Sequence, residues 1–155
     1  MMITSEVFLN NLCDVRVRIA NACEASGRSP DEVTLLPVTK SWPIEAARLA
    51  FSAGFFSVGE NRVMEALEKM ESATLEGHWE LIGHLQSNKV KFIPHKFCRV
   101  QSVDSLRILR RLNTAAENSN CILRVLLQVN AGKDPAKFGV LPEEACGFLE
   151  TALSC

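Results

Sequence analysis

Apolar residues recur along this chain with two alternating periods, one typical of helices and one typical of buried strands. The first helix is predicted near the N-terminus, where Phe8, Leu12 and Cys23 fall on one face and Gly27 ends the pattern. A run rich in β-branched and aliphatic residues follows at 33–39, but its Pro37 lacks the amide donor that a central strand needs. We therefore expect this strand to lie at an edge of the sheet or to bulge there.

From residue 44 onward, predicted helices and strands alternate. Helices are expected at 44–53, 60–72, 87–92 and 105–117, with a last helix that carries Ala145, Phe148, Leu149 and Ala152. Strands are expected at 55–58, 79–82, 98–103 and 122–129, the last being the longest. The order is an N-terminal helix followed by five strand–helix (βα) units, which favours a parallel sheet covered by helices.

This α/β order is compatible with a doubly wound open sheet or with part of a (β/α)8 TIM barrel. About five βα units are too few to close a barrel, which needs eight strands and roughly 250 residues. The last helix runs to Cys155 without a cap, so we expect a single domain over 1–155 that is truncated at its C-terminal side. Its first and fifth strands would then be open edges, through which self-association could occur.

Composition narrows the class of protein. Of 155 residues, 47% are hydrophobic and 23% charged, which are ordinary values for a soluble domain. A formal net charge of −1 gives no general attraction to nucleic acid or to a membrane surface. No apolar run reaches the ~20 residues of a membrane span, and the acidic Glu6 and Asp14 are unlike a signal peptide. We expect a cytoplasmic protein with no nucleic-acid and no membrane partner.

The six cysteines are widely scattered, with no CxxC pair and no Cys/His spacing typical of a metal site. Without a signal peptide, free and mostly buried thiols are the favoured interpretation, and no metal is expected. The cysteines are Cys13, Cys23, Cys98, Cys121, Cys146 and Cys155.

Lys40 is the first candidate for chemistry. It lies where the first predicted strand ends, and Pro43 with Glu45 marks the first turn of the next helix. Ligands of parallel α/β folds bind at the carboxyl ends of strands. Partial desolvation and the nearby helix N-terminus would both favour a neutral amine, which attacks aldehydes to form a Schiff base. By position alone, a solvated lysine at the end of a strand remains the alternative.

Two further candidate site residues follow the next two predicted strands. Asn61 belongs to Gly59-Glu60-Asn61-Arg62, where Gly59 permits a tight turn and Asn61 could donate a hydrogen bond to a ligand ring oxygen. His84 follows the strand at 79–82 and could act as a general base or orient a neighbouring group. The alternatives are a polar residue in the first turn of a helix for Asn61, and a histidine held by backbone groups for His84.

The stretch from Lys89 to Arg99 is locally basic and also contains Lys91, His95 and Lys96. It could approach RNA or a phosphate, but exposed aromatic residues are not interleaved with the charges. A solvated helix and loop surface is the favoured interpretation. No Ser/His/Asp set, zinc motif or nucleotide-binding glycine pattern is present.

Taken together, six segments resemble the pyridoxal phosphate homeostasis protein family. They are LLPVTKSWP, FSVGENRVME, HWELIGHLQSNKVK, VQSVDS, LLQVN and KFGVLPEEA, which occur in the family's order over roughly 33–150. The pair formed by GEN and IGHLQSNKVK is highly specific. The resemblance implies a partial (β/α)8 barrel like the N-terminal domain of alanine racemase.

The resemblance also implies a ligand and a role. Lys40 matches the family lysine that holds pyridoxal 5'-phosphate (PLP) as an internal aldimine, and Asn61 matches the asparagine of GEN near the cofactor. Family members vary at the position of His84, so its role is not carried over. Such proteins are regarded as monomeric carriers in intracellular PLP (vitamin B6) homeostasis without an established reaction. A catalytic residue is therefore not expected.

This chain departs from the family pattern in two respects. Arg62 replaces the usual aromatic residue after GEN, and the later serine, glycine/threonine turn and arginine that bind the cofactor are not present. We therefore expect weaker PLP binding than in the family. A PLP-dependent racemase-like enzyme and a non-functional remnant remain alternatives, although the chain has no tyrosine to serve as a racemase acid or base.

Overall fold

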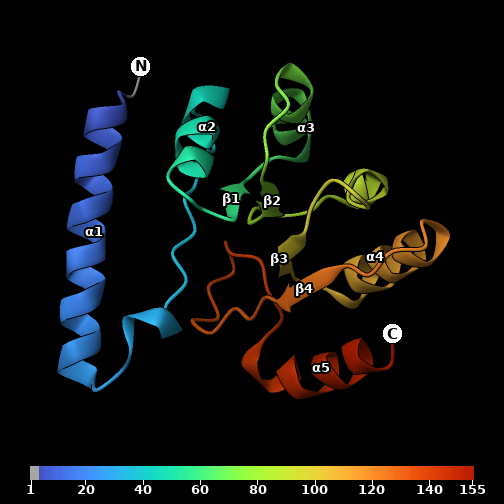
Figure 1. Cartoon of the computed structure of the whole chain (residues 1–155). Coiled ribbons are helices and arrows are strands. Elements are labelled where there is room, and N and C mark those ends of the chain that lie inside the picture. The colour runs from blue at the N-terminus through green and yellow to red at the C-terminus, as the bar shows by residue number, and fades with distance from the viewer. Residues whose placement is uncertain (1–3) are drawn as a thin grey trace.

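A computed structural model describes residues 4–155 and contains one parallel sheet wrapped by helices (Figure 1). The strands follow the order β1-β2-β3-β4, which is also their order along the chain. They are β1 (Ser57–Glu60), β2 (His78–Leu81), β3 (Arg99–Val103) and β4 (Arg124–Leu127). Sequential parallel strands with helical crossovers are the pattern of a partial α/β barrel, so the expected fold class is confirmed.

Helices lie on the outer side of the curved row of strands (Figure 1). The α-helices are α1 (Ser5–Ser26), α2 (Ile44–Ser52), α3 (Val63–Ser72), α4 (Leu106–Asn118) and α5 (Ala145–Leu153). Three short 3₁₀ helices are η1 (Pro30–Glu32), η2 (Ser87–Phe92) and η3 (Pro142–Glu144). Among the described residues, no helix has both the length and the apolar character needed to cross a membrane.

The N-terminal helix ends as its sequence predicts. Gly27 adopts φ 67°, a left-handed conformation that glycine tolerates without a steric penalty, and the Arg28 amide donates to the Cys23 carbonyl at 2.9 Å. At the other end, the Thr4 hydroxyl accepts a hydrogen bond from the Val7 amide. Leu12 and Cys23 are buried, in agreement with the predicted apolar stripe.

The expected strand at 33–39 is reduced to a single bridge between Val38 and Gly59. The Gly59 amide donates to the Pro37 carbonyl at 2.8 Å, and the Thr39 amide donates to the Gly59 carbonyl at 3.0 Å. The contact is parallel and forms one edge of the sheet, as expected from the missing Pro37 amide. The preceding residues of the run are not part of a ladder.

The expectation that 122–129 forms the longest strand is wrong. β4 has four residues and β3 has five, while Ile122 is exposed and Val129 pairs separately with Val140. β4 is short because its neighbour β3 ends at Val103. The Gln128 amide donates to the Val103 carbonyl, and later residues have no partner in that ladder.

The two faces of the sheet differ in polarity. Val58, Trp79, Leu81 and Val100 point toward the helices and belong to the hydrophobic core. Neighbouring residues in a strand point to opposite faces, so the inner face carries Glu80 instead. Its carboxylate accepts hydrogen bonds from Ser57 and Gln101, each at 2.7 Å, and forms an ion pair with Arg99 at 3.5 Å.

The cysteines are free, but the expectation that most of them are buried is wrong. Only Cys23 is buried, whereas Cys98 and Cys121 are half-buried and the remaining three are exposed. Partial burial is the main cause of a raised pKa of the Cys98 thiol, and the nearby Glu80 carboxylate adds to it. No group of three or more His, Cys, Asp or Glu side chains among residues 4–155 is arranged to hold a metal ion.

Candidate functional site

Lys40 lies in a turn that continues directly from the edge bridge. The Trp42 amide donates to the Thr39 carbonyl at 3.1 Å, which closes a turn over Lys40 and Ser41. Ser41 has φ 62°, the sign that a type II turn requires at its third residue. The Ser41 amide donates to Glu65 Oε1 at 2.9 Å, so a carboxylate on α3 stabilises this unusual conformation.

A buried ion network underlies this turn. Lys69 Nζ on α3 lies 2.7 Å from Glu60 Oε1, 2.9 Å from the Thr39 carbonyl and 3.0 Å from Glu65 Oε1. The Thr39 hydroxyl also donates to Glu60 Oε1, at 2.7 Å. Glu60 is fully buried, and its Oε2 has no hydrogen-bond partner in the described part of the chain. The network therefore fixes the backbone immediately before Lys40.

The charge state of Glu65 is tied to the same turn. The Ser41 amide, together with a hydrogen bond and charge attraction from Lys69, holds the pKa of the Glu65 carboxyl below its usual value, against a smaller opposing effect of burial. Glu65 is consequently ionised at neutral pH and accepts hydrogen bonds from both groups.

The Lys40 side chain is exposed, so the expected partial desolvation is wrong. Thr39 points into the network beside α3, and Lys40 follows it as the first of the two central residues of the turn. The register pairs Val38 with Gly59, and Lys40 and Asn61 each follow their partner by two residues. Both residues therefore belong to the carboxyl edge of the sheet, where barrel folds bind ligands.

Asn61 occupies the connection between β1 and α3 rather than the first helical turn. The helix begins at Val63 with Arg62 as its cap, and Gly59 lies within β1 instead of forming the expected tight turn. A Cβ atom at Gly83 would collide with the Asn61 carbonyl, so only glycine lets the loop after β2 approach so closely. Asn61 lines a pocket of about 590 Å³ together with Arg62, His84, Gln86 and Lys89, among others. Lys40 is not among the residues that line it.

His84 is held by a carboxylate rather than by backbone groups. Its Nδ1 lies 2.6 Å from Oδ2 of the nearly buried Asp104, whose other oxygen accepts a hydrogen bond from the Ser105 hydroxyl. The ring stacks on Phe138, with 3.7 Å between centroids and 10° between planes. Asp104 thus orients the imidazole, and Nε2 is left for a ligand or solvent in the pocket shared with Asn61.

The remaining polar candidates make structural contacts. His95 Nε2 lies 3.0 Å from the Ser119 carbonyl, and His78 packs against the Phe56 ring. In the basic stretch, Arg99 faces Glu80 across the sheet, and Lys91 lies 5.0 Å from the Phe92 ring centroid. The basic stretch therefore does not form one continuous charged surface.

Sequence reasoning missed several residues of the site. Lys69, Glu65 and Asp104 are ordinary helical or loop charges in the sequence, and Phe138 lies in a distant loop. One signal was available for Lys69: it falls three residues after Ala66 on the apolar face of α3, where a lysine requires a buried partner. The partner itself, Glu60, could not be inferred from spacing.

Comparison with known proteins identifies the family and several relatives of this chain. The family model of the alanine racemase N-terminal domain matches residues 16–155. A protein of Pseudomonas aeruginosa named pyridoxal phosphate homeostasis protein is 42% identical over 90% of this chain and 61% of its own length. A Haemophilus influenzae protein of the same name is 37% identical over 87% of this chain and 58% of its own. The chain spans about three fifths of the length of these curated relatives.

Solved structures agree on the fold. A Bifidobacterium adolescentis protein described as unknown superposes with a TM-score of 0.88 at 29% identity, over 97% of this chain and 67% of that one. PipY of Synechococcus elongatus, solved with PLP bound, superposes with a TM-score of 0.69 at 31% identity, over 86% and 63%. Because the family model covers most of the chain and these structures share its parallel α/β architecture, the chain belongs to the alanine racemase N-terminal domain family.

Proposed function

We propose that this chain binds pyridoxal 5'-phosphate as a Schiff base on Lys40 and serves in homeostasis of this cofactor, without catalysing a reaction of its own. The observation that carries the proposal is the position of Lys40, an exposed amine that extends from an immobilised turn at the carboxyl edge of the sheet, next to the strand that ends in Asn61. The PLP-bound relative PipY and the curated relatives named pyridoxal phosphate homeostasis protein support it.

The residues at this edge fit one part of the cofactor. A primary amine condenses with the PLP aldehyde and releases water, and Lys40 has no hydrogen-bond or ion-pair partner among the described residues that would have to be displaced. The Asn61 amide can donate to a ring oxygen of the cofactor. When bound, PLP supplies an electrophilic aldehyde and an electron-withdrawing ring.

The surrounding residues position the amine rather than react. Lys69 holds the Thr39 carbonyl, and Glu65 holds the Ser41 amide, so the backbone on both sides of Lys40 is fixed. Asp104 orients His84 beside the pocket that contains Asn61. These contacts restrict the motion of Lys40 at its Cα while its side chain stays accessible, which suits reversible loading and release of a carried ligand.

Borohydride reduction tests the attachment directly. After incubation with PLP and reduction, we expect a single pyridoxyl adduct, assigned by peptide mass spectrometry to Lys40. Lys40→Arg should abolish that adduct, whereas Lys89→Arg, which changes the lysine that lines the Asn61 pocket, should retain it. Adducts spread evenly over many lysines, or an unchanged adduct in Lys40→Arg, would contradict the proposal.

A racemase-like enzyme is the second candidate, and the oriented His84–Asp104 pair is the observation that favours it. Exchange of the α-proton of L-alanine in deuterated water, with PLP added, separates the two functions. We expect exchange no faster than with free PLP. A faster rate that disappears in His84→Gln would establish the enzyme instead.

A further inference from the structure

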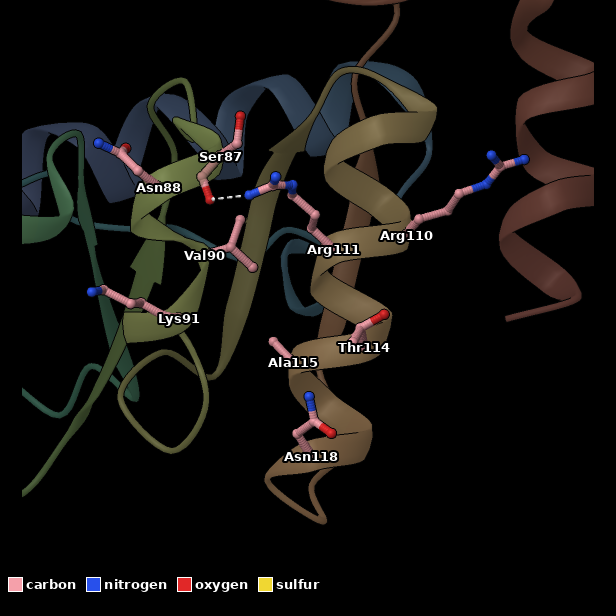
Figure 2. A pocket seen from close by; sticks show the side chains of 9 residues that line it. All are labelled: Ser87, Asn88, Val90, Lys91, Arg110, Arg111, Thr114, Ala115 and Asn118. Atoms are coloured by element: carbon pink, nitrogen blue, oxygen red, sulfur yellow. Dashed lines mark hydrogen bonds between the residues drawn. The ribbon is translucent and has the colours of Figure 1, made fainter.

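The proposed function leaves the basic stretch of the sequence unused. One of its residues, Lys91, lines a cavity between η2 and α4 together with arginines of α4. Arg107, Arg111, Ala115 and Asn118 occur at helical spacing on one face of α4 and line cavities against η2. Figure 2 shows Arg111 pointing toward η2, with its Nη1 donating to the Ser87 carbonyl at 3.3 Å, whereas Arg110 points away.

The upper part of this surface is a small cationic pocket of about 500 Å³. It is lined by Arg107 and Arg111 together with the polar side chains of Gln86, Ser87, Asn88 and His84. The lining contains no carboxylate, and neither arginine forms an ion pair within the described chain. The nearest acid in sequence, Asp104, is bonded to His84 and Ser105 and is not a lining residue.

Two arginines at i and i+4 repel each other on an isolated helix, so their arrangement does not favour folding. Their Cβ atoms are expected about 5–6 Å apart, which lets both guanidinium groups reach one tetrahedral anion. Guanidinium binds phosphate with paired, charge-assisted hydrogen bonds, and a phosphate monoester carries close to two negative charges that would balance both arginines.

The lower part of the surface offers space for the organic part of such a ligand. A groove of about 680 Å³ continues past Ser87, Asn88 and Arg111, which also line the cationic pocket. The groove is lined by Val90 and Ala115, and Asn118 adds an amide at its far end, whereas the Asn88 amide points away from α4 (Figure 2). Its volume is within the range of small-molecule sites, and its mixture of apolar and amide groups suits a flat ring with polar edges.

We propose that this groove between η2 and α4, the phosphoester groove, binds an organic phosphate monoester of nucleotide size. The phosphate contacts Arg107 and Arg111, and the organic part packs on Val90 and Ala115 beside the Asn118 amide. The site is separate from Lys40 and does not depend on the proposed cofactor attachment. A nucleic-acid surface is less well supported because no Phe, Trp or Tyr side chain lines either cavity.

Isothermal titration with adenosine 5'-monophosphate tests this assignment, since this ligand has no aldehyde that could react with lysines. We expect saturable binding at one site per chain, and binding of adenosine at least tenfold weaker. Arg107→Gln and Arg111→Gln should each weaken binding by about 10- to 100-fold, the range for a lost charge-assisted contact. The control Arg48→Gln, which changes an exposed arginine on α2 outside both cavities, should stay within about threefold.

Any of the following three outcomes would overturn the proposal. Equal binding in all three arginine variants would indicate general charge attraction. Inorganic phosphate binding as tightly as adenosine monophosphate would exclude a role of the groove in holding an organic part. Tighter binding of a single-stranded oligonucleotide that also requires Arg110 would indicate a nucleic-acid surface. Circular dichroism of each variant establishes that loss of binding is not loss of fold. Arg107→Gln removes no hydrogen bond of the described chain, so it provides the second variant if Arg111→Gln unfolds.

Discussion

Lys69 is the residue on which the local geometry of the candidate site depends most. Replacing it with methionine would leave the fully buried Glu60 carboxylate without its ammonium partner. We expect Lys69→Met to lower the free energy of unfolding by about 3–5 kcal/mol, the range for a broken buried ion pair. Urea denaturation at neutral pH measures the change.

The double variant Glu60→Leu/Lys69→Met supplies the control, because it removes both buried charges. We expect it to regain most of the lost stability, since apolar pairs often replace buried ion pairs at little cost. A single Lys69→Met variant as stable as the parent chain would show that water, rather than the ammonium group, can satisfy Glu60.

Gly83 is the second residue with a sharp local requirement. An alanine Cβ at this position would overlap the Asn61 carbonyl, a backbone atom that cannot rotate away. We expect Gly83→Ala to destabilise the chain by about 1–3 kcal/mol, the usual cost of overpacking, and to shift the loop that carries His84. Thermal unfolding measures the first effect, and chemical shifts of the Asn61 amide measure the second.

The Glu65 carboxylate gives the site an acid limit. Its pKa is lowered in the folded chain, so its stabilising contribution is complete above the unfolded value near 4.5 and is lost as the pH falls through the lower folded value. We expect Glu65→Gln to reduce the difference in unfolding free energy between pH 7 and pH 4. Glu71→Gln, an exposed change of the same charge on α3, is the control, and an equal effect of both variants would contradict this role.

At the scale of elements, the sequence predicted two helices and the strands β2 and β3 closely, but it misplaced β1, β4 and the start of α3. η2 and α4 lie within one residue of expectation, and α1 ends before Gly27 as expected, because apolar periodicity and caps such as Gly27 and Ser105 are local signals. β1 was expected at 55–58 but lies at Ser57–Glu60, since its position is set by pairing with β2. Local composition contains no information about which carbonyl across the sheet accepts each amide.

The same distinction applies to the site. The carboxyl-edge placement of Lys40 and Asn61 follows from the strand–helix order, which the sequence shows. Glu65 and Lys69 are four residues apart, but the other contacts of the Lys69 network and the His84–Asp104 pair join residues nine to thirty positions apart, so spacing alone could not predict them.

α5 offers a test of helix propensity within an element. Gly147 lies inside this helix, and an alanine Cβ there meets no atom within 4 Å, so Gly147→Ala should raise stability by about 0.5–1 kcal/mol. Gly54 has equal free space but φ 86°, so Gly54→Ala should be destabilising. Denaturant midpoints compare the two, and stabilisation by both would show that backbone conformation at Gly54 is not limiting.

At the scale of the whole molecule, the inner face of the sheet has an apolar margin. Val38 and Leu126, on the two edges, are each nearly half exposed and point away from the covering helices. Because open edges and exposed apolar side chains favour pairing between copies, we propose that the chain self-associates. The average mass in analytical ultracentrifugation should rise with concentration.

Leu126→Lys should suppress this association by introducing a charge at the edge, whereas Val17→Lys on the exposed side of α1 should not. A single mass at all concentrations in the parent chain, or equal behaviour of both variants, would contradict association through the sheet.

The centre of the inner face is polar, in contrast to its apolar edges, and this polarity determines where the fold places its hydrophobic layer. Closed barrels fill their interior with branched aliphatic side chains, which would be costly to hydrate. Here the equivalent layer is organised by Glu80, whose oxygens are already satisfied by a serine, a glutamine and an arginine. The buried Glu80 therefore has its partners within the sheet itself, and the fold keeps its main hydrophobic layer on the convex side, against the helices.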